Sequence, residues 1–335
     1  MLPTTRFTER AAVDAWDSWF RWRNAEGLRD RTIDATWWRV ADAIADAEGA
    51  QDRQWAYRYV DAFSRWQLLP DERLLRMAGT GSGLNPFDSP CAALNVAAFV
   101  TAPHTQQARF DGERFAGVAT LAVRLLDDAL VTMHGPAPTF PGLRIGLIGL
   151  GDALHLLGIR YDDQRASEQA CAVGMALATG TLRGTTELAQ ERGPIDARPA
   201  HLVALWRDRG APEELIEAAM RVGVRHTRLT AIGLQPHLAL LANNTSDALD
   251  PRPSWAGNGQ ANPAARARDE SAPPGATAVV TAQLAIRAAI QPWIDAPIEY
   301  PVTVNAEANR DSIDSYVQLA CAYGLCEPSF RYREH

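Results

Sequence analysis

The sequence contains no lysine, and all 33 of its basic residues are arginine. A Schiff-base lysine and the lysine of a phosphate-binding loop are therefore excluded. With 40 acidic residues the formal net charge is −7, which argues against a nucleic-acid-binding surface and favours solubility. We expect no nucleic acid among the partners.

Cysteines are few, and long apolar runs are missing. The four cysteines, at positions 91, 171, 321 and 326, are too scattered for a disulfide framework, and they lack the paired spacing of a zinc site. No window reaches the ~18 apolar residues of a membrane span, and the first residues lack the apolar core of a secretory signal. We therefore expect a cytoplasmic protein with no metal and no membrane contact.

Residues 1–80 have the apolar spacing of helices. Apolar side chains recur at helical intervals in residues 11–22, 36–46 and 55–63. Seven of the ten tryptophans lie before residue 67, which is typical of an aromatic helical bundle or of an interface. We predict an N-terminal helical domain over residues 1–80.

Beyond a glycine-rich junction, strand-like and helical segments alternate, which predicts an α/β domain with a parallel sheet over residues 81–335. Residues 251–275 are rich in proline, glycine, alanine and asparagine and predict a mobile loop. Strands are expected at residues 92–99, 143–148, 228–234, 302–305 and 329–332. Helices are expected at residues 112–129, 152–157, 166–192, 212–224, 278–293 and 311–324.

Residues 144–151 (RIGLIGLG) suggest a dinucleotide-binding turn, in which glycine amides cradle a pyrophosphate at a helix N-terminus. Three features argue against it. Leu154 replaces the third glycine of that fingerprint, and no second mononucleotide-binding half follows. Asp162 and Asp163 come about eleven residues after the turn, whereas the acidic ribose ligand is expected after about twenty. We therefore disfavour dinucleotide binding.

Segments spread along the chain resemble one known family, in the same order. The matching segments are residues 91–99 (CAALNVAAF, resembling C-N-L-G-S-I-N-L-A-x-F), 122–127 (AVRLLD, A-x-R-F-L-D), 144–162 (R-I-G-L-G-V-x-G-L-A-D-L…L-G-I-x-Y-D-S), 187–193 (ELAQERG, E-L-A-x-E-R-G) and 225–232 (RHTRLTAI, R-N-x-x-L), with Asp250-Pro251 resembling E-P. On these segments the chain resembles the large subunits of ribonucleotide reductases, of the adenosylcobalamin-dependent kind, and the resemblance covers most of residues 55–335.

The resemblance implies a fold. In the family, two five-stranded parallel halves close into a ten-stranded α/β barrel, with a finger loop inside. Here residues 78–80 (AGT) resemble the entry to the barrel, and Cys91 follows almost at once. By this comparison the first half-barrel and the finger loop are deleted. We therefore expect the N-terminal helical domain to be followed by a single five-stranded parallel half of that barrel.

The family's chemistry depends on residues that this sequence lacks. The finger loop carries a radical cysteine in N-x-C-x-E, and Phe87 stands at that place in the remnant at residues 85–88. Cys91 matches one of two redox cysteines, but its partner is missing. At residues 234–239 (LQPHLA), apolar groups replace the hydroxyls of the phosphate-binding turn, and Pro236 removes one N–H donor.

The remaining site candidates are polar groups at the family's ligand positions. Cys91 and His237 are the candidates for catalysis, although a lone cysteine is more often a small buried apolar group. The candidates for ligand binding are Asn95, His226, Gln235, His237 and Tyr332. In the family topology, Glu187 and Asp250 would lie near His226 and His237.

Two functional hypotheses follow. The first is a catalytically inactive relative that acts by binding, as a scaffold or as a regulator of an active reductase. The second is an enzyme, either part of a split ribonucleoside-diphosphate reductase or a remodelled barrel acting on a nucleotide-like substrate. We favour the first, because the radical cysteine, its redox partner and the phosphate turn are lost together. No cofactor is predicted, and adenosylcobalamin is implied by the resemblance alone.

A half-barrel leaves sheet edges unpaired, here residues 92–99 at one side, and an apolar face that must be covered. Either the N-terminal helices fold over the opening, or two chains meet there about a twofold axis. We predict the homodimer. The candidate interface or lid residues are Trp16, Trp19, Trp37 and Trp38.

Overall fold

The computed structural model describes residues 2–49, 53–82, 89–135, 142–251, 276–325 and 328–332. The finger-loop remnant with Phe87 and nearly all of the predicted loop over residues 251–275 lie outside these described residues.

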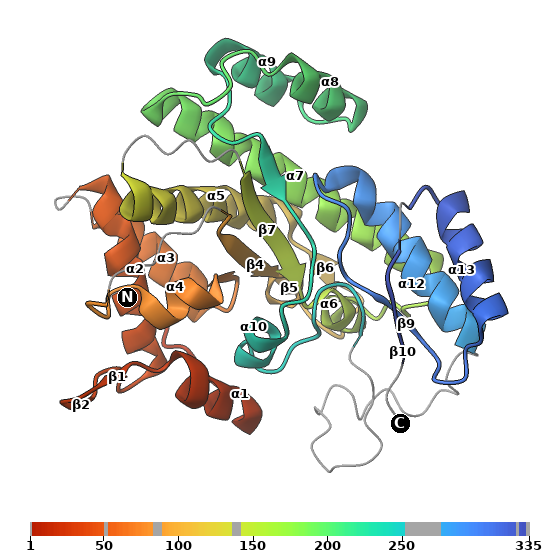
Figure 1. Cartoon of the computed structure of the whole chain (residues 1–335), viewed down its shortest axis with the longest axis horizontal. Helices are drawn as coiled ribbons and strands as arrows, with labels where there is room; N and C mark the ends of the chain where they lie inside the picture. The colour runs from red at the N-terminus through yellow and green to blue at the C-terminus, as the bar shows by residue number, and fades with distance from the viewer. Residues whose placement is uncertain are drawn as a thin grey trace.

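A four-stranded mixed sheet lies at the centre (Figure 1). Its strand order is β3 (Leu68–Pro70), β4 (Cys91–Asn95), β7 (Gly142–Ile148) and β8 (Arg228–Thr230). The last three strands are parallel, and β3 runs antiparallel to β4. The α/β architecture with a parallel core is therefore confirmed, and its strands are mostly buried, as parallel strands covered by helices usually are.

The five predicted strands do not form one sheet, so a single five-stranded half-barrel sheet is wrong for the described residues. β4 stops at Asn95, where a short 3-10 helix (Val96–Phe99) begins. β9 (Val302–Val304) and β10 (Phe330–Tyr332) form a separate parallel pair. Beside β8, residues 296–299 donate backbone hydrogen bonds to the carbonyls of Thr230 and Ile232 without forming a strand. Prolines at 297 and 301 explain this, because they cannot donate to a ladder.

Two long helices, α5 (Gly112–His134) and α7 (Gln164–Arg192), lie behind the sheet in Figure 1. Both begin where an aspartate side chain accepts a backbone N–H of the first turn, Asp111 for α5 and Asp163 for α7. The predicted helices at these places are confirmed. Gly180 of α7 faces α5 so closely that a Cβ there would lie 2.2 Å from the Ala116 carbonyl oxygen.

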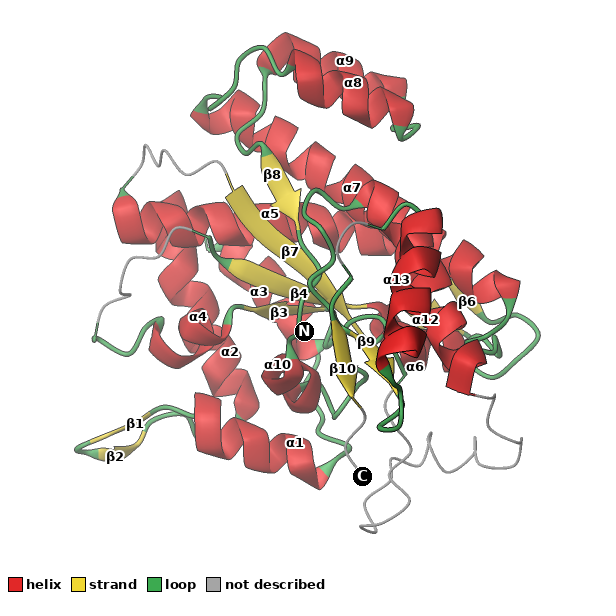
Figure 2. Ribbon diagram, turned by 45° about the vertical axis from the view of Figure 1, so that its right-hand side comes forward, coloured by secondary structure: helices red, strands yellow, loops and turns green. Residues whose placement is uncertain are grey.

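The other helices surround this layer, as Figure 2 shows from a second side. These other helices are α1 (Arg10–Ala15) with a π-helical turn (Trp16–Phe20), α2 (Ile33–Ala45), α3 (Gln54–Ser64), α4 (Glu72–Met77), α6 (Leu150–Leu156), α8 (Ala200–Asp208), α9 (Glu213–Val222), α10 (Pro236–Leu241), α12 (Ala276–Ile290) and α13 (Arg310–Ala322). Among them, α6, α9, α12 and α13 match predicted helices to within a few residues, whereas α8 and α10 were not predicted.

The N-terminal helices share one hydrophobic core with the sheet and α10. Trp16 and Trp37 are buried in it, and their indole N–H groups donate to Thr36 and Thr5. Of the two roles predicted for them, interface or lid, the interface role is therefore wrong for Trp16 and Trp37, because a partner chain cannot reach them. Trp19 and Trp38 stay partly exposed.

The sheet edge at residues 92–99 is not open, contrary to the expectation behind the homodimer. β3 pairs along it, from Leu68 opposite Leu94 to Pro70 opposite Ala92. The homodimer itself stays a prediction, and light scattering during size-exclusion chromatography would measure it.

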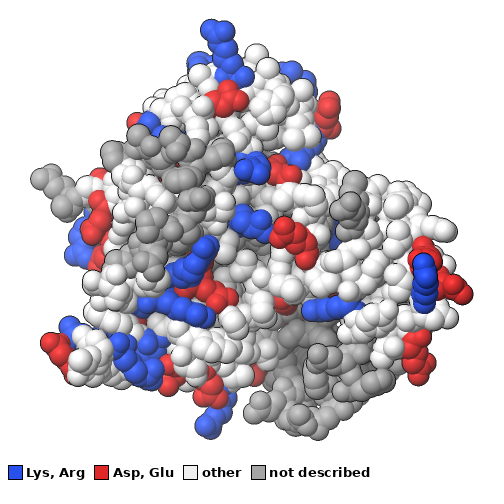
Figure 3. Space-filling view, in the orientation of Figure 1, with Lys and Arg blue, Asp and Glu red and all other residues white. Residues whose placement is uncertain are grey.

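Charged side chains of both signs are interspersed over the face seen in Figure 3. Among the described residues, no helix combines the length and the apolar character that crossing a membrane requires.

The α5–α7 contact yields a stability prediction. Gly180→Ala should lower the free energy of unfolding by about 1–3 kcal/mol, because overpacking this crossing outweighs the better helix propensity of alanine. Gly117→Ala on α5 is the matched control, since nothing lies within 4 Å of its added Cβ. That variant should be neutral or more stable by up to about 1 kcal/mol. Urea denaturation measures both, and equal effects of the two substitutions would contradict the packing argument.

Candidate functional site

The predicted site residues fall in four places rather than one. Cys91, Gln235 and His237 lie near the start of α4, and His226 belongs to a buried ion cluster. Asn95 ends β4 against the turn at Gly149, and Tyr332 is exposed on β10.

Cys91, the first residue of β4, is hydrogen-bonded to the side chain of Asp71. Its thiol donates a hydrogen bond to Oδ2 of Asp71 at 3.1 Å, and the same oxygen accepts the Cys91 backbone N–H at 3.1 Å. Asp71 precedes α4 and also binds Arg73. Burial is the larger cause and the negative charge of Asp71 the next, and together they raise the pKa of the Cys91 thiol to about 12. The thiol is therefore protonated at neutral pH, and this is not the nucleophilic or metal-binding form.

His237 lies in the first turn of α10. Its Nδ1 atom is 3.0 Å from Oε2 of Glu72, and its ring centroid is 4.3 Å from that of Trp19. Glu72 is the first residue of α4, directly after Asp71. One short helix therefore places a carboxylate against Cys91 and a second carboxylate against His237.

The turn before α10 also lacks donors for an anion. Pro236 has no N–H, and the N–H of Gln235 donates to Oδ1 of Asp247 at 2.9 Å. Burial raises the pKa of Asp247 to about 6, so this carboxyl is largely ionised at neutral pH. An anion at this turn would meet the carboxylates of Glu72 and Asp247 in place of hydroxyl groups.

The glycine-rich turn at residues 146–151 is packed against other chain segments. Gly149 has φ +79°, and a Cβ there would lie 2.4 Å from Oδ1 of Asn95. The N–H of Gly149 donates to the Ser246 carbonyl at 2.7 Å, and the N–H of Leu150 donates to the Ala248 carbonyl at 3.3 Å. These amides are occupied by the protein's own loop, which agrees with the sequence argument against a dinucleotide at this turn.

The buried ion cluster is centred on Asp127 of α5. Its Oδ1 lies 2.9 Å from Nε2 of His226 and 3.1 Å from Nε of Arg225, and its Oδ2 accepts from Arg192 of α7. Burial alone would raise the pKa of Asp127, but His226 and the two arginines outweigh burial and hold it well below the usual value.

A second carboxyl extends the cluster. Asp128 accepts hydrogen bonds from the Tyr59 hydroxyl and from Arg192, and burial raises its pKa to about 7. Glu48 binds Arg192 and Arg124 at 2.6 Å each. Asp127 and Asp128 have no exposed surface, and His226 has 1%, so these groups stabilise the fold rather than meet a ligand from solvent.

Comparison with known proteins gives a family match for residues 89–251. These residues match the family model of the ribonucleotide reductase barrel domain. They are related to that barrel domain, as the sequence resemblance predicted.

The curated relatives are much longer than the matched region. A vitamin B12-dependent ribonucleoside-diphosphate reductase of Mycobacterium tuberculosis (strain ATCC 25618 / H37Rv) is 29% identical over 115 residues, which are 32% of this chain and 16% of that protein. A ribonucleoside-diphosphate reductase subunit alpha of Chlamydia pneumoniae is 26% identical over 117 residues, 33% of this chain and 11% of that protein. The match thus spans less than a fifth of the length of either relative.

The reductase-like motifs converge on the ion cluster. Asp127 belongs to residues 122–127, Arg192 to residues 187–193, and Arg225 with His226 to residues 225–232. These three motifs therefore supply the buried charges that join α5, α7 and the segment before β8. Asp127 and His226 at the centre of the cluster are buried away from solvent.

Sequence reasoning missed the roles of Asp71 and Glu72. Their local signal was present, since Pro70-Asp71-Glu72 is typical of a helix start. Their partners, Cys91 and His237, lie 20 and 165 residues away along the chain, and no local pattern pairs them.

Removing the central charge should destabilise the fold. Asp127→Asn leaves Arg225 and His226 facing a neutral group, and the loss of a buried partner costs about 3–5 kcal/mol of unfolding free energy. The loss should diminish as pH falls below about 4, because the lowered pKa of Asp127 stabilises the folded state only where the unfolded carboxyl is ionised.

Denaturation across a pH series measures this effect. Glu213→Gln, which breaks an exposed pair with Arg207, is the control and should leave stability nearly unchanged. A loss for Asp127→Asn as small as that of the control would contradict the central role of Asp127.

Cys91 should resist alkylation. Raising the thiol pKa from 9.0 to about 12 lowers the thiolate fraction by about three orders of magnitude. Cys321 is exposed on α13 and is the internal reference. Iodoacetamide labelling followed by mass spectrometry should show Cys321 modified first, and Asp71→Asn should accelerate labelling of Cys91. Equal rates at the two cysteines in the unmodified chain would show that Cys91 is reactive.

Proposed function

We propose that this chain is a catalytically inactive, reductase-like protein that acts by binding, as a scaffold or as a regulator of an active reductase. One observation carries the proposal. Asp71 and Glu72, adjacent at the start of α4, bind Cys91 and His237. The family resemblance puts redox chemistry at the first of these positions and phosphate binding close to the second. A carboxylate opposes both, because it suppresses the thiolate and repels a phosphate.

Two further features support loss of the reaction. The other described cysteines lie on helices: Cys171 on α7, where the Trp293 indole lies 3.3 Å from its sulfur, and Cys321 exposed on α13. Neither sits in β4 or in a strand beside Cys91. The match to the ribonucleoside-diphosphate reductases also spans less than a fifth of their length, so much of what those proteins use is outside the matched region.

The N-terminal segment supports closure of the α10 side within one chain. The Trp19 ring packs at a tilt against the His237 ring, the N–H of Thr8 donates to Oδ1 of Asn243, and Nδ2 of Asn243 donates to the Arg6 carbonyl. A ligand entering at α10 would have to displace these contacts.

The catalytic test is a reduction assay with the purified chain, ribonucleoside diphosphates, dithiothreitol and adenosylcobalamin. We expect no deoxynucleotide above the no-protein background, because the radical cysteine of the family is missing and the Cys91 thiol stays protonated. Deoxynucleotide formed by this chain would overturn the proposal in favour of the enzyme hypothesis, including its split-reductase form.

The binding test uses calorimetry with nucleoside diphosphates. We expect weak or absent binding, with Glu72→Gln improving it by removing the repulsive charge. Low-micromolar binding that His237→Ala abolishes, and that the exposed control His201→Ala preserves, would contradict the proposal. Sedimentation with the reductase of the same organism then tests the regulatory role, which fails if neither association nor a change in reductase rate is seen.

A further inference from the structure

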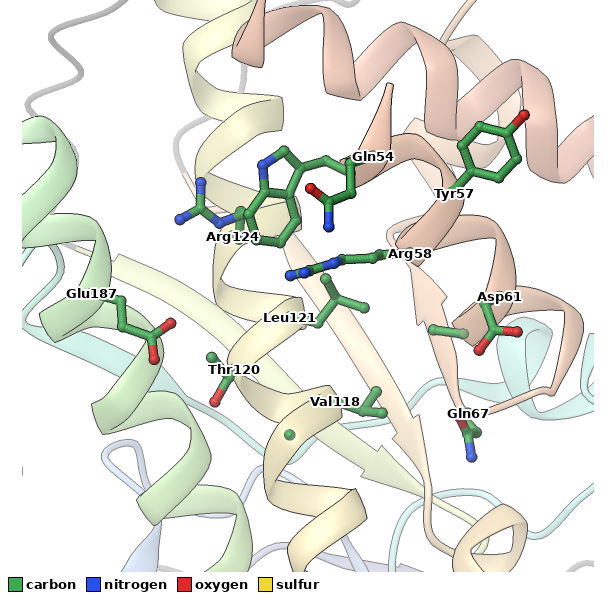
Figure 4. A pocket seen from close by; sticks show the side chains of 13 residues that line it. Gln54, Tyr57, Arg58, Asp61, Gln67, Val118, Thr120, Leu121, Arg124 and Glu187 are labelled. Atoms are coloured by element: carbon green, nitrogen blue, oxygen red, sulfur yellow. The ribbon is translucent and has the colours of Figure 1, made fainter. Parts of the chain in front are cut away.

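A groove with a volume of about 480 Å³ lies between α3, α5 and α7 (Figure 4). Sites for small molecules usually have volumes of about 300–1,000 Å³ and combine apolar walls with a few convergent polar groups. Val118, Leu121 and Trp55 line the groove and supply apolar surface to it. Neither Cys91 nor His237 lines it, so it is separate from those two sites, although Arg124 and Glu187 in its lining belong to the reductase-like segments 122–127 and 187–193.

One side of the groove offers an available cation. The Arg58 guanidinium lies 4.5 Å from the centre of the Trp55 ring and has no hydrogen bond or ion pair with any residue that the structure describes. Arg124 lies 4.0 Å from the same ring but is neutralised by Glu48 and Glu191. Of these two guanidiniums, Arg58 is the one free to bind an added anion.

The opposite side offers acceptors. In Figure 4 the Glu187 carboxylate, on α7, faces the space that Arg58 enters, and it accepts no hydrogen bond from a described residue. The Thr120 hydroxyl donates to the Gly180 carbonyl at 2.8 Å or to the Ala116 carbonyl at 3.1 Å. Because its one hydrogen is used in this way, Thr120 presents lone pairs to the groove.

We propose that this groove binds a small zwitterion, whose carboxylate or phosphate meets Arg58 and whose ammonium group meets Glu187 and Thr120. Arg58 and Glu187 line the same groove without a salt bridge between them, although Arg183, Arg124 and Arg58 all act electrostatically on the Glu187 carboxylate. A ligand with both charges can therefore contact each of them directly, whereas a ligand with a single charge would contact only one. The methylene groups between the two charges would pack on Val118 and Leu121. This site does not depend on the proposed function, because it uses none of the residues around α4 and α10.

The distance between the two charges can be measured with a series of ligands. Glycine, γ-aminobutyrate and ε-aminohexanoate place the two charges progressively farther apart, and 2-aminoethyl phosphate replaces the carboxylate by a phosphate. Butylamine and hexanoate carry one charge each. Calorimetry and thermal shift on the full chain should show binding of at least one zwitterion, and weaker or no binding of the single-charge controls. If no zwitterion binds better than butylamine or hexanoate, the proposal is wrong.

Two variants locate the binding. Arg58→Gln and Glu187→Gln should each raise the dissociation constant of the best zwitterion on the order of tenfold, since each removes one charge-assisted contact. Arg207→Gln and Glu213→Gln, in an exposed pair on α8 and α9, are the charge-matched controls and should leave it unchanged. Melting without ligand checks that each variant is folded. Binding that survives either groove substitution at full strength would overturn the assignment, whatever the reduction assay shows.

Discussion

The packing of α5, α7 and β8 depends on the buried interactions of the Asp127 carboxylate. This carboxylate lies on α5 and binds Arg192 at the end of α7 and the Arg225-His226 pair just before β8. Buried charges are costly unless each is paired, so the cluster forms only when all three segments are in place. It therefore sets the two long helices and the last parallel strand relative to one another. The close α5–α7 crossing at Gly180 follows from the same placement.

This constraint links three of the reductase-like segments. Residues 122–127, 187–193 and 225–232 supply the buried charges, and replacing Asp127 would remove the carboxylate that Arg192, Arg225 and His226 share. The turn at residues 234–239 has no such coupling. Several of its residues are exposed or half-buried, so apolar groups and a proline can stand there at little cost to folding.

The N-terminal segment takes the places that an open half-sheet would leave exposed. β3 pairs along the edge of β4, and α4 carries acidic side chains to Cys91 and to α10. Trp19 closes over His237, while Trp16 and Trp37 fill the shared core. These contacts join the first 80 residues to the sheet through apolar packing and charge, without a second chain. The groove behind Trp55 arises at the same junction, where α3 meets α5 and α7.

Local sequence determined the long elements. The apolar spacing and the aspartate caps of α5 and α7 act within a few residues, so their positions followed from the chain itself. The motif order likewise indicated the relation of residues 89–251 to the barrel domain.

Tertiary structure alone decided which strands pair with one another and which side chains meet at the site. Residues 302–304 pair with residues 330–332 rather than with the main sheet, and the pairing of Glu72 with His237 joins positions 165 residues apart. Such contacts form only after the helices pack, because no periodicity or spacing along the chain encodes which distant side chains will meet.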